Sequence, residues 1–284
     1  MKNFFVIANR AKEDSQRITD EICEYIAKKG ASAVIDDTPQ GAIPGGYTDI
    51  KRLPQDTDCV IVLGGDGTLL HAANDLIDSS VPLLGINIGN MGYLSAVDIE
   101  DRFDAIDKVM TGSFSVEKRM MLSGRCCCDG QTQGSRRALN EIVITGNKAM
   151  QIVYVSLYIN GKLLHRYNGD GIIIATPTGS TGYSLSAGGP IVSPQAQMII
   201  VTPICAHSMQ GRSMVFSPDD TIKVTIDEGR FCTPQEVLAV FDSSNSVVLK
   251  TGDSVEIHRS EHTTALIRVR EESFIDTLHN KLKD

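Results

Sequence analysis

The chain has 284 residues, of which 42% are hydrophobic and 22% charged, and its formal net charge is −8. This composition is typical of a soluble globular protein, and the length suggests two domains. The acidic balance argues against a nucleic-acid partner, which would need a basic face. Apolar runs fall short of the roughly 18 residues of a membrane span, and no signal-peptide pattern is present, so we expect a cytoplasmic protein with no membrane partner.

The first part of the chain alternates apolar runs with segments of helical periodicity. The runs 4–8, 32–36, 58–63 and 81–87 are typical of buried parallel strands, and the segments 15–30, 68–77 and 98–112 of helices. This alternation predicts an α/β domain over 1–113, with a parallel sheet flanked by helices.

The second part, 114–284, is predicted to be a β-rich domain. Short apolar strands separated by turn residues dominate it, and Asn160-Gly161 predicts a hairpin turn. Residues 274–284 predict a short amphipathic helical tail.

The seven cysteines include three in a row, Cys126 to Cys128, within the polar stretch "GRCCCDGQTQGSRR". Their spacing is not that of a zinc site, so we predict no bound metal and free thiols. We also expect the three consecutive cysteines to be dispensable.

The stretch "IVLGGDGTLLH" places Asp66 among Gly64, Gly65 and Gly67, where a strand ends and a helix begins. Glycines allow a sharp turn and let phosphate oxygens approach backbone amides, and ligands bind at the carboxyl ends of parallel strands. The alternative is a tight turn in which Asp66 or Thr68 caps the helix. Neither the P-loop motif nor the dinucleotide fingerprint is present.

Two further stretches carry polar groups suited to a ligand. In "RYNGDGIIIATPTGSTGYSLSAGGPIVSP" (166–194), Asp170 lies between glycines and a dense run of Thr, Gly, Ser and Tyr follows. A flexible linker is the alternative, which the flanking apolar strands disfavour. Asn140 and Glu141 could hydrogen-bond a base edge and a ribose diol, or could lie at the solvated surface.

These stretches resemble the NAD kinase family, in order and over nearly the whole chain. The matching segments are "GGDGTLL", "GINIGNMGYLS", "VEKRMML", "LNEIVI", "GDGIIIATPTGSTGYSLSAGGPIV" and "TPICAHSMQGRSMVF". The GGDG motif alone is shared with lipid kinases and resembles that of phosphofructokinases, whereas "TPTGSTGYSLSAGGPI" is specific. Four positions depart from the family pattern. Gly182 stands where Ala is usual, Ser243 follows Asp242 where Gly is common, and Met91 and Ser95 replace the more usual Leu and Thr.

The resemblance implies phosphorylation of the 2′-hydroxyl of the adenosine ribose of NAD by ATP, giving NADP, with Mg²⁺ or another divalent cation. It implies a homo-oligomer, a tetramer or dimer. It makes Asp66 the general base and Gly64, Gly65 and Gly67 the phosphate-facing turn. NAD contacts fall on Asn140, Glu141, Asp170, Thr181, Gly182, Tyr183, Ser184, Leu185, Ser186 and Asp242.

Some assignments stay open at this stage. His71 could touch the NAD pyrophosphate or face solvent. Lys118, Arg119 and Arg166 are basic candidates by adjacency to the motifs. The alternative functions are a GGDG-type kinase that acts on a different alcohol, such as a lipid or sugar phosphate, and a non-catalytic dinucleotide sensor.

Overall fold

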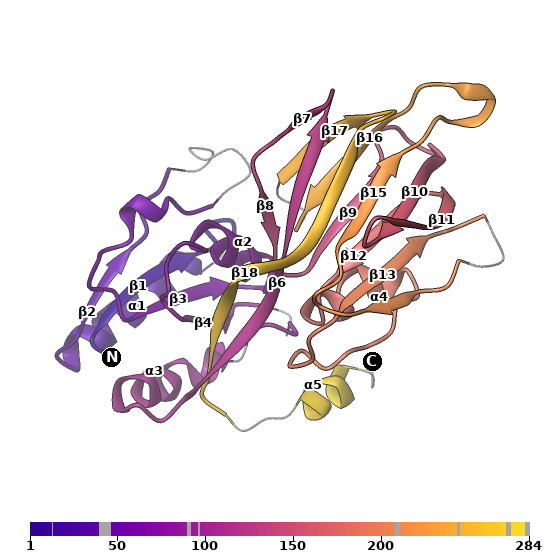
Figure 1. Ribbon diagram of the computed structural model, residues 1–284. Coiled ribbons are helices and arrows are strands. Elements are labelled where there is room, and N and C mark those ends of the chain that lie inside the picture. Colours follow the sequence, from indigo (N-terminus) through magenta and orange to yellow (C-terminus); the bar gives the residue numbers. More distant parts are fainter. Residues whose placement is uncertain are drawn as a thin grey trace. The chain divides into compact units, whose positions relative to one another are not determined.

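The computed structural model describes residues 1–12, 14–39, 47–89, 92–95, 97–207, 211–242, 245–270 and 274–281. The chain forms two compact units (Figure 1). Unit 1 consists of Met1–Arg119 and Thr264–Asp284, and unit 2 of Met120–Thr263. Met91 and Ser243 lie outside the described residues.

Unit 1 contains the predicted parallel sheet. Its strands run in the order β4-β3-β1-β2, and all these neighbours are parallel: β1 (Asn3–Ala8), β2 (Ser32–Ile35), β3 (Cys59–Gly64) and β4 (Leu83–Asn87). Every residue of β3 and β4 is buried, as expected for strands that are covered on both faces. The α/β prediction is confirmed.

Two helices of unit 1 end close to the glycines that predicted their ends. Helix α1 (Ser15–Lys28) buries Ile18, Ile22 and Ile26 in the core, and α3 (Arg102–Thr111) ends at Gly112, whose φ is 83°. Helix α2 (Asp66–Asp75) begins two residues earlier than predicted, with Gly65 as its N-cap. The two-residue strand β5 (Val97–Asp98) and a 3₁₀ turn, Ile99–Asp101, occupy the predicted start of the third helix.

The strand order determines where a ligand is expected. The chain passes from β1 to β2 on one side of β1 and then returns to β3 on the other side. The order of the sheet therefore reverses between β1 and β3, and ligands of such sheets bind beyond the carboxyl ends of the strands at this reversal. The segments that follow β1 and β3 begin with Asn9 and Gly65.

The end of the chain belongs to unit 1. In the long strand β18 (Ser254–Arg268), Leu266 pairs in parallel with Leu83 of β4, and Ile267 lies in the same core as Ile22. The units therefore differ from the expected domains 1–113 and 114–284, because this pairing depends on residues far apart in the sequence. Helix α5 (Phe274–Lys281) follows.

Unit 2 is β-rich, as predicted, and packs two sheets around one core. Antiparallel pairing joins β14-β13-β12-β9-β16-β17 in one sheet and β11-β10-β15-β18 in the other. Apolar side chains of both sheets, such as Ile144 and Val224, share one core cluster. The first sheet comprises β9 (Glu141–Gly146), β12 (Gly171–Ala175), β13 (Ile199–Ile204), β14 (Met214–Phe216), β16 (Glu236–Phe241) and β17 (Asn245–Lys250). The second contains β10 (Val153–Ile159), β11 (Lys162–Gly169) and β15 (Ile222–Ile226) besides β18.

The hairpin prediction is confirmed. Asn160 and Gly161 connect β10 and β11 with φ values of 50° and 76°, the left-handed pair that a two-residue hairpin turn requires.

The consecutive cysteines are less exposed than their polar sequence context suggests. They lie on strand β6 (Ser115–Cys128), which pairs with β18, β7 (Gln131–Thr132) and β8 (Arg136–Ala138). Cys126 is fully buried in the core of unit 2, whereas Cys127 and Cys128 are half-buried. All seven cysteines are free thiols.

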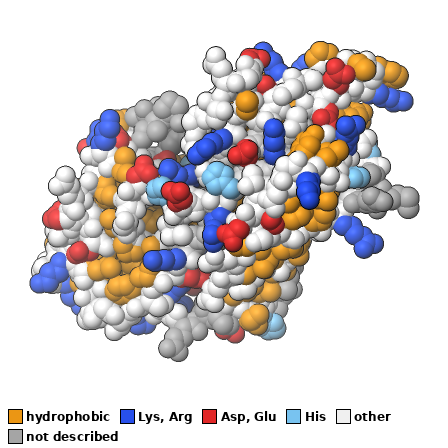
Figure 2. Space-filling view, viewed as in Figure 1, with side chains coloured by type: hydrophobic (Ala, Val, Ile, Leu, Met, Phe, Trp, Pro, Cys, Tyr) orange, Lys and Arg blue, Asp and Glu red, His pale blue; other side chains and the backbone are white. Residues whose placement is uncertain are grey.

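No helix of the described part is long and apolar enough to span a membrane. On the face shown in Figure 2, basic and acidic side chains are interspersed.

Candidate functional site

The glycine loop, Gly64 to Gly67, contains two kinds of glycine. A Cβ on Gly64 would lie 2.3 Å from Thr68 Oγ1, so packing alone requires glycine there. A Cβ on Gly65 or Gly67 would meet nothing within 4 Å, and neither residue has a positive φ. Because glycine within a helix costs about 1 kcal/mol relative to alanine, Gly67 has no evident structural advantage. The two glycines leave the backbone at the start of α2 accessible.

The Asp66 carboxylate holds the segment after β4. Oδ2 accepts the Tyr93 N–H at 2.7 Å, and Oδ1 accepts those of Leu94 and Ser95 at 3.1 and 3.3 Å. A Cβ on Gly92 would lie 1.8 Å from Asp66 Oδ1, so only glycine permits this approach. The capping alternative is wrong for Asp66, because the helix has Gly65 as its N-cap and no side-chain cap bond. A carboxylate offers about four acceptor positions, so one remains for a ligand.

Two residues that the sequence analysis missed lie near this loop. Asn9 donates its N–H to Leu63 O at 2.9 Å, which extends the pairing of β1 with β3, and its Nδ2 donates to Thr68 Oγ1 at 3.4 Å. Lys12 Nζ lies 3.0 Å from the position that a Cβ would take on Gly89. The sequence could have identified Lys12 by its position, because Lys12 follows β1 just as the glycine loop follows β3.

His71, on α2, is half-buried rather than solvent-facing. Its ring lies 5.9 Å from that of Tyr47, centroid to centroid, and its Nδ1 is buried with no partner among the described residues. Asp75, one turn further on, accepts the N–H groups of Tyr47 and Thr48 at 2.6 and 2.8 Å. Burial raises the pKa of Asp75.

In unit 2, Asp242 organises the segment that contains Asn140 and Glu141. Its Oδ2 accepts the Leu139 N–H at 2.5 Å, and Oδ1 accepts those of Asn140 and Glu141 at 2.9 and 3.0 Å. Asp242 is 4% exposed and has a φ of 44°, a conformation that Asp tolerates better than most residues. Asp242 therefore serves as a fixed anchor for the backbone at the start of β9.

Glu141 and Asn140 each contain a buried polar atom without a partner among the described residues. These atoms are Glu141 Oε2 and Asn140 Oδ1. Burial raises the pKa of Glu141 to about 8, and the charge of Asp242 adds to the effect. The surface alternative for this pair is wrong, because Glu141 is only 7% exposed. Buried polar atoms normally have partners, so this pair is suited to a polar ligand.

The segment 176–182 packs against this pair. Thr176 donates its N–H to Asn140 O at 2.8 Å and its hydroxyl to Leu139 O at 2.6 Å. A Cβ on Gly182 would lie 3.2 Å from Glu141 Oε2 and 3.4 Å from Asn140 Nδ2. The linker alternative is therefore wrong, and Gly182 adjoins the two unpartnered groups.

The remaining predicted contacts in this run lie in different environments. Tyr183 is 46% exposed, Ser186 is exposed, and Leu185 and Thr181 are half-buried. Ser184 is fully buried, with its Oγ 3.0 Å from Thr202 Oγ1, so this hydroxyl is engaged within the protein.

Asp170 is not brought next to Glu141. In the pairing of β12 with β9, Gly171 lies opposite Thr145 and Ala175 opposite Glu141. Four residues of strand separate these positions, which is about 13 Å. The exposed Asp170 hydrogen-bonds the Cys205 thiol and thereby raises its pKa.

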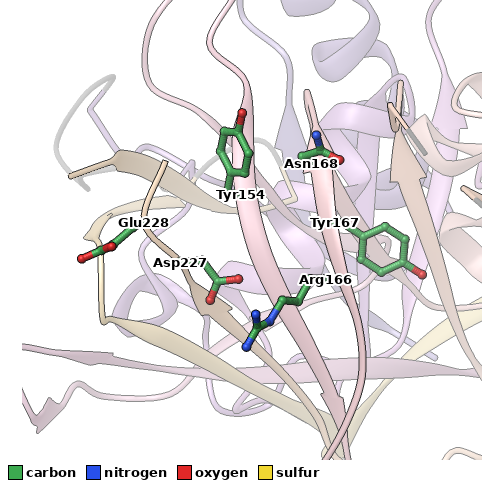
Figure 3. A pocket seen from close by; sticks show the side chains of 6 residues that line it. All are labelled: Tyr154, Arg166, Tyr167, Asn168, Asp227 and Glu228. Atoms are coloured by element: carbon green, nitrogen blue, oxygen red, sulfur yellow. The ribbon is translucent and has the colours of Figure 1, made fainter. Parts of the chain in front are cut away.

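The three basic candidates also differ. Arg119 is 3% exposed and forms an ion pair with Glu117 at 2.8 Å, so it is committed within unit 1, while Lys118 is exposed. Arg166 lines a hollow of about 440 Å³ beside the β10–β11 hairpin. Figure 3 shows its side chain extending toward Asp227, which accepts the Ser156 hydroxyl at 2.7 Å.

Comparisons with known proteins show the family to which the chain is similar. The ATP-NAD kinase N-terminal domain model matches residues 4–114, and the C-terminal domain model matches 139–269. A protein named NAD kinase from Lachnoclostridium phytofermentans is 40% identical over 100% of both chains. Another, from Agathobacter rectalis, is 40% identical over 99% of both chains.

Solved structures agree at the level of the fold. Yeast NADH kinase complexed with NADH has a TM-score of 0.90 at 22% identity, covering 100% of this chain and 88% of its own. An NAD kinase from Archaeoglobus fulgidus in complex with ATP has a TM-score of 0.77 at 25% identity, covering 100% and 99%. With both family domains in order and relatives that match along its full length, the chain belongs to the NAD kinase family.

Proposed function

We propose that the protein transfers the γ-phosphoryl group of ATP to the 2′-hydroxyl of the adenosine ribose of NAD, giving NADP. The observation that supports this function best is the Asn140–Glu141 pair, which holds two buried, unpartnered polar atoms beside Gly182. A lipid or sugar phosphate as acceptor is not favoured, because relatives that match along the full chain are NAD kinases.

Asn140 and Glu141 bind the adenosine part of NAD in this proposal. With a pKa of about 8, the Glu141 carboxyl is mostly protonated near neutral pH, so it offers both a donor and an acceptor. The Asn140 side chain offers the same two functions. Adenine and a ribose diol also present donors and acceptors side by side, which matches the pair.

Asp66 orients the attacking hydroxyl. Three amide donors fix its carboxylate, and the remaining acceptor position receives the hydrogen bond of the 2′-hydroxyl. As the bond from the 2′-oxygen to the γ-phosphorus forms, the bond from phosphorus to the bridging oxygen breaks and ADP leaves. Asp66 accepts the hydroxyl proton and releases it to solvent. Positioning supplies most of the catalysis in such transfers, and accessible amides at Gly65 and Gly67 suit the phosphates.

A divalent cation is part of the proposal. No cluster of three His, Cys, Asp or Glu side chains in the described ranges is arranged to hold a metal ion. Mg²⁺ commonly binds through substrate phosphates and water with few protein ligands. We therefore assign its ligands chiefly to ATP, whose negative charge it offsets.

We also propose a homo-oligomer, a dimer or tetramer, that works in the cytoplasm. Strand β11 forms the end of its ladder and exposes Leu163 and Leu164 by 48% and 44%, which suits coverage by a second copy. A second copy could also supply Asp170, which lies far along β12 from Glu141. Seven unpaired cysteines are typical of a reducing compartment.

The test is the formation of NADP from ATP, Mg²⁺ and NAD, measured with an NADP-specific dehydrogenase. Parallel reactions replace NAD with NADH, a diacylglycerol or a sugar phosphate, and one adds a chelator. Glu141→Ala removes both the donor and the acceptor and should raise the KM for NAD, whereas the matched control Glu256→Ala, on exposed strand surface, should not. The proposal is supported if the parent protein forms NADP and phosphorylates neither the diacylglycerol nor the sugar phosphate. It is refuted if the protein phosphorylates one of these alcohols and forms no NADP.

A further inference from the structure

A second hollow, of about 440 Å³, lies in unit 1 beyond the carboxyl ends of β1 and β2. Its lining includes Arg10, Lys12, Ser15, Arg17 and Asp36. The first turn of α1 forms one wall. The mechanism above uses none of these residues.

Ser15 gives this hollow an unpartnered donor. It is the first residue of α1, it is only 3% exposed, and its Oγ has no hydrogen-bond partner among the described residues. The N-cap residue, Asp14, forms no side-chain cap bond. The N-terminus of a 14-residue helix favours anions, and a buried hydroxyl without a partner costs about 1–3 kcal/mol. An anion would provide that partner.

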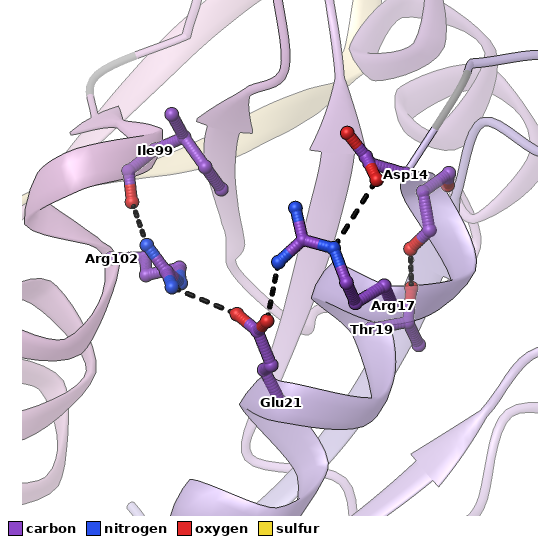
Figure 4. Close-up of polar contacts among 7 residues, drawn as sticks. Asp14, Arg17, Thr19, Glu21, Ile99 and Arg102 are labelled. Carbon is purple, nitrogen blue, oxygen red and sulfur yellow. Dashed lines mark hydrogen bonds and ion pairs between the residues drawn. The ribbon is translucent and has the colours of Figure 1, made fainter.

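Most charges around the hollow are already engaged. Arg17 contacts Asp14 at 3.2 Å and Glu21 at 2.5 Å, and Glu21 also pairs with Arg102 (Figure 4). Arg10 donates to the carbonyl oxygen of Asp36 at 2.6 Å.

The remaining carboxylates also have partners. Asp37 pairs with Arg52, and Asp36 accepts hydrogen bonds from Thr38 and Thr48. Of the charged residues that line the hollow, Lys12 alone has no hydrogen bond or ion pair from its side chain to the described part of the chain.

Lys12 also lies near the glycine loop. Gly89 has a φ of 143°, which suits only glycine, and Lys12 Nζ lies 3.0 Å from the position that a Cβ would take there. The neighbouring Ile88 donates its N–H to Gly64 O at 3.2 Å, which joins this segment to the glycine loop. The ammonium thus lies at the strand ends where a phosphate chain is expected, with no ion pair to the described residues.

We propose that Lys12 and Ser15 bind the phosphate chain of the ATP donor. Lys12 supplies the mobile positive charge, and the Ser15 hydroxyl donates a hydrogen bond from the start of α1. This inference rests on the proposed function. The donor is favoured over the NAD pyrophosphate because the hollow and the glycine loop both belong to unit 1, while Asn140 and Glu141 belong to unit 2.

The test compares Lys12→Ala, Lys12→Arg and Ser15→Ala with Lys148→Ala, an exposed lysine between β9 and β10, as control. Lys12→Ala should raise the KM for ATP about tenfold or more, because charge-assisted contacts are among the stronger hydrogen bonds. Ser15→Ala should raise it about threefold, since a neutral hydrogen bond contributes less. Lys12→Arg should retain most of the affinity, and the KM for NAD should stay within about twofold throughout.

Inorganic tripolyphosphate separates this inference from the proposed function. Its dissociation constant, measured by calorimetry with no NAD present, should rise in Lys12→Ala by the same factor as the KM for ATP. An unchanged KM for ATP and unchanged tripolyphosphate binding would overturn the inference while leaving NADP formation by the parent intact. A rise in the KM for NAD alone would overturn the assignment to the donor. If the parent makes no NADP, the proposed function fails, and tripolyphosphate binding still decides the role of Lys12.

Discussion

Asp242 and Glu141 are joined by reciprocal hydrogen bonds. The Asp242 N–H donates to Glu141 O at 3.1 Å, and the Glu141 N–H donates to Asp242 Oδ1 at 3.0 Å. The same Asp242 carboxylate raises the pKa of Glu141 through its charge. One residue thus fixes the backbone of the candidate NAD-binding segment and influences the protonation of its carboxyl group.

Replacing Asp242 should therefore change both properties. Asp242→Asn keeps a side chain that tolerates the positive φ, but it leaves one oxygen for three N–H donors. We expect the free energy of unfolding to fall by about 1–3 kcal/mol, the KM for NAD to rise, and the pKa of Glu141 to fall. The matched control is Asp129→Asn, at another Asp with a positive φ, 49°. An unchanged KM for NAD in Asp242→Asn would contradict the anchoring role.

Glu141→Gln should change how stability depends on pH. The folded-state pKa of about 8 exceeds the ordinary 4.5, so the folded protein retains a proton that the unfolded chain releases between these values. Stability of the parent should therefore fall as pH rises from 4.5 to 8, and this contribution should then level off. Gln cannot titrate, so the variant should gain stability relative to the parent over that window. Urea unfolding from about pH 5 to about pH 9 measures the difference, and parallel curves would refute it.

Asp66→Asn tests the residue that orients the hydroxyl. Asn is a far weaker base and offers one oxygen, so it cannot accept on both sides as Asp66 does from Tyr93 and Leu94. NADP formation should fall on the order of 10²–10⁴-fold. The thermal midpoint should also fall, because the side-chain NH₂ of Asn replaces one acceptor oxygen and would face a backbone N–H donor. A rate within about tenfold of the parent, a barrier difference of ~1.4 kcal/mol, would leave Asp66 with a structural role only.

Gly92→Ala moves Asp66 without changing its chemistry. The new Cβ would lie 1.8 Å from Asp66 Oδ1, so the carboxylate or its loop must shift. We expect the rate of NADP formation to fall at saturating ATP and NAD. The control is Gly134→Ala, where a Cβ meets nothing within 4 Å. A parental rate in Gly92→Ala would show that the loop does not position Asp66.

The consecutive cysteines should differ in their effect on stability. Cys126→Ser places a hydroxyl in the core of unit 2 and should cost about 1–3 kcal/mol, whereas Cys127→Ser, at a half-buried position, should cost much less. Cys126→Ala controls for the loss of sulfur contacts. Denaturant midpoints of the three variants measure the order, and equal midpoints would contradict it.

Local chemistry determined much of the fold from the sequence. The apolar run of β3 predicted a buried parallel strand because both of its faces are covered, and Asn160-Gly161 predicted a hairpin because both residues adopt positive φ. The glycine loop was recognised because its glycines and Asp66 stand where an apolar strand ends and a helix begins. Each of these signals lies within a few residues, so periodicity and turn preferences reveal it.

Contacts between distant residues were decided only by the tertiary structure. Leu266 pairs with Leu83, Asp66 accepts hydrogen bonds from backbone N–H groups of the segment after β4, and Lys12 Nζ lies 3.0 Å from the Cβ position of Gly89. None of these has a local pattern, because the partners approach only when the sheet orders its strands. Burial has the same origin: Glu141 and Cys126 look polar or neutral in sequence, and only the packing of unit 2 removes them from water and raises both pKa values.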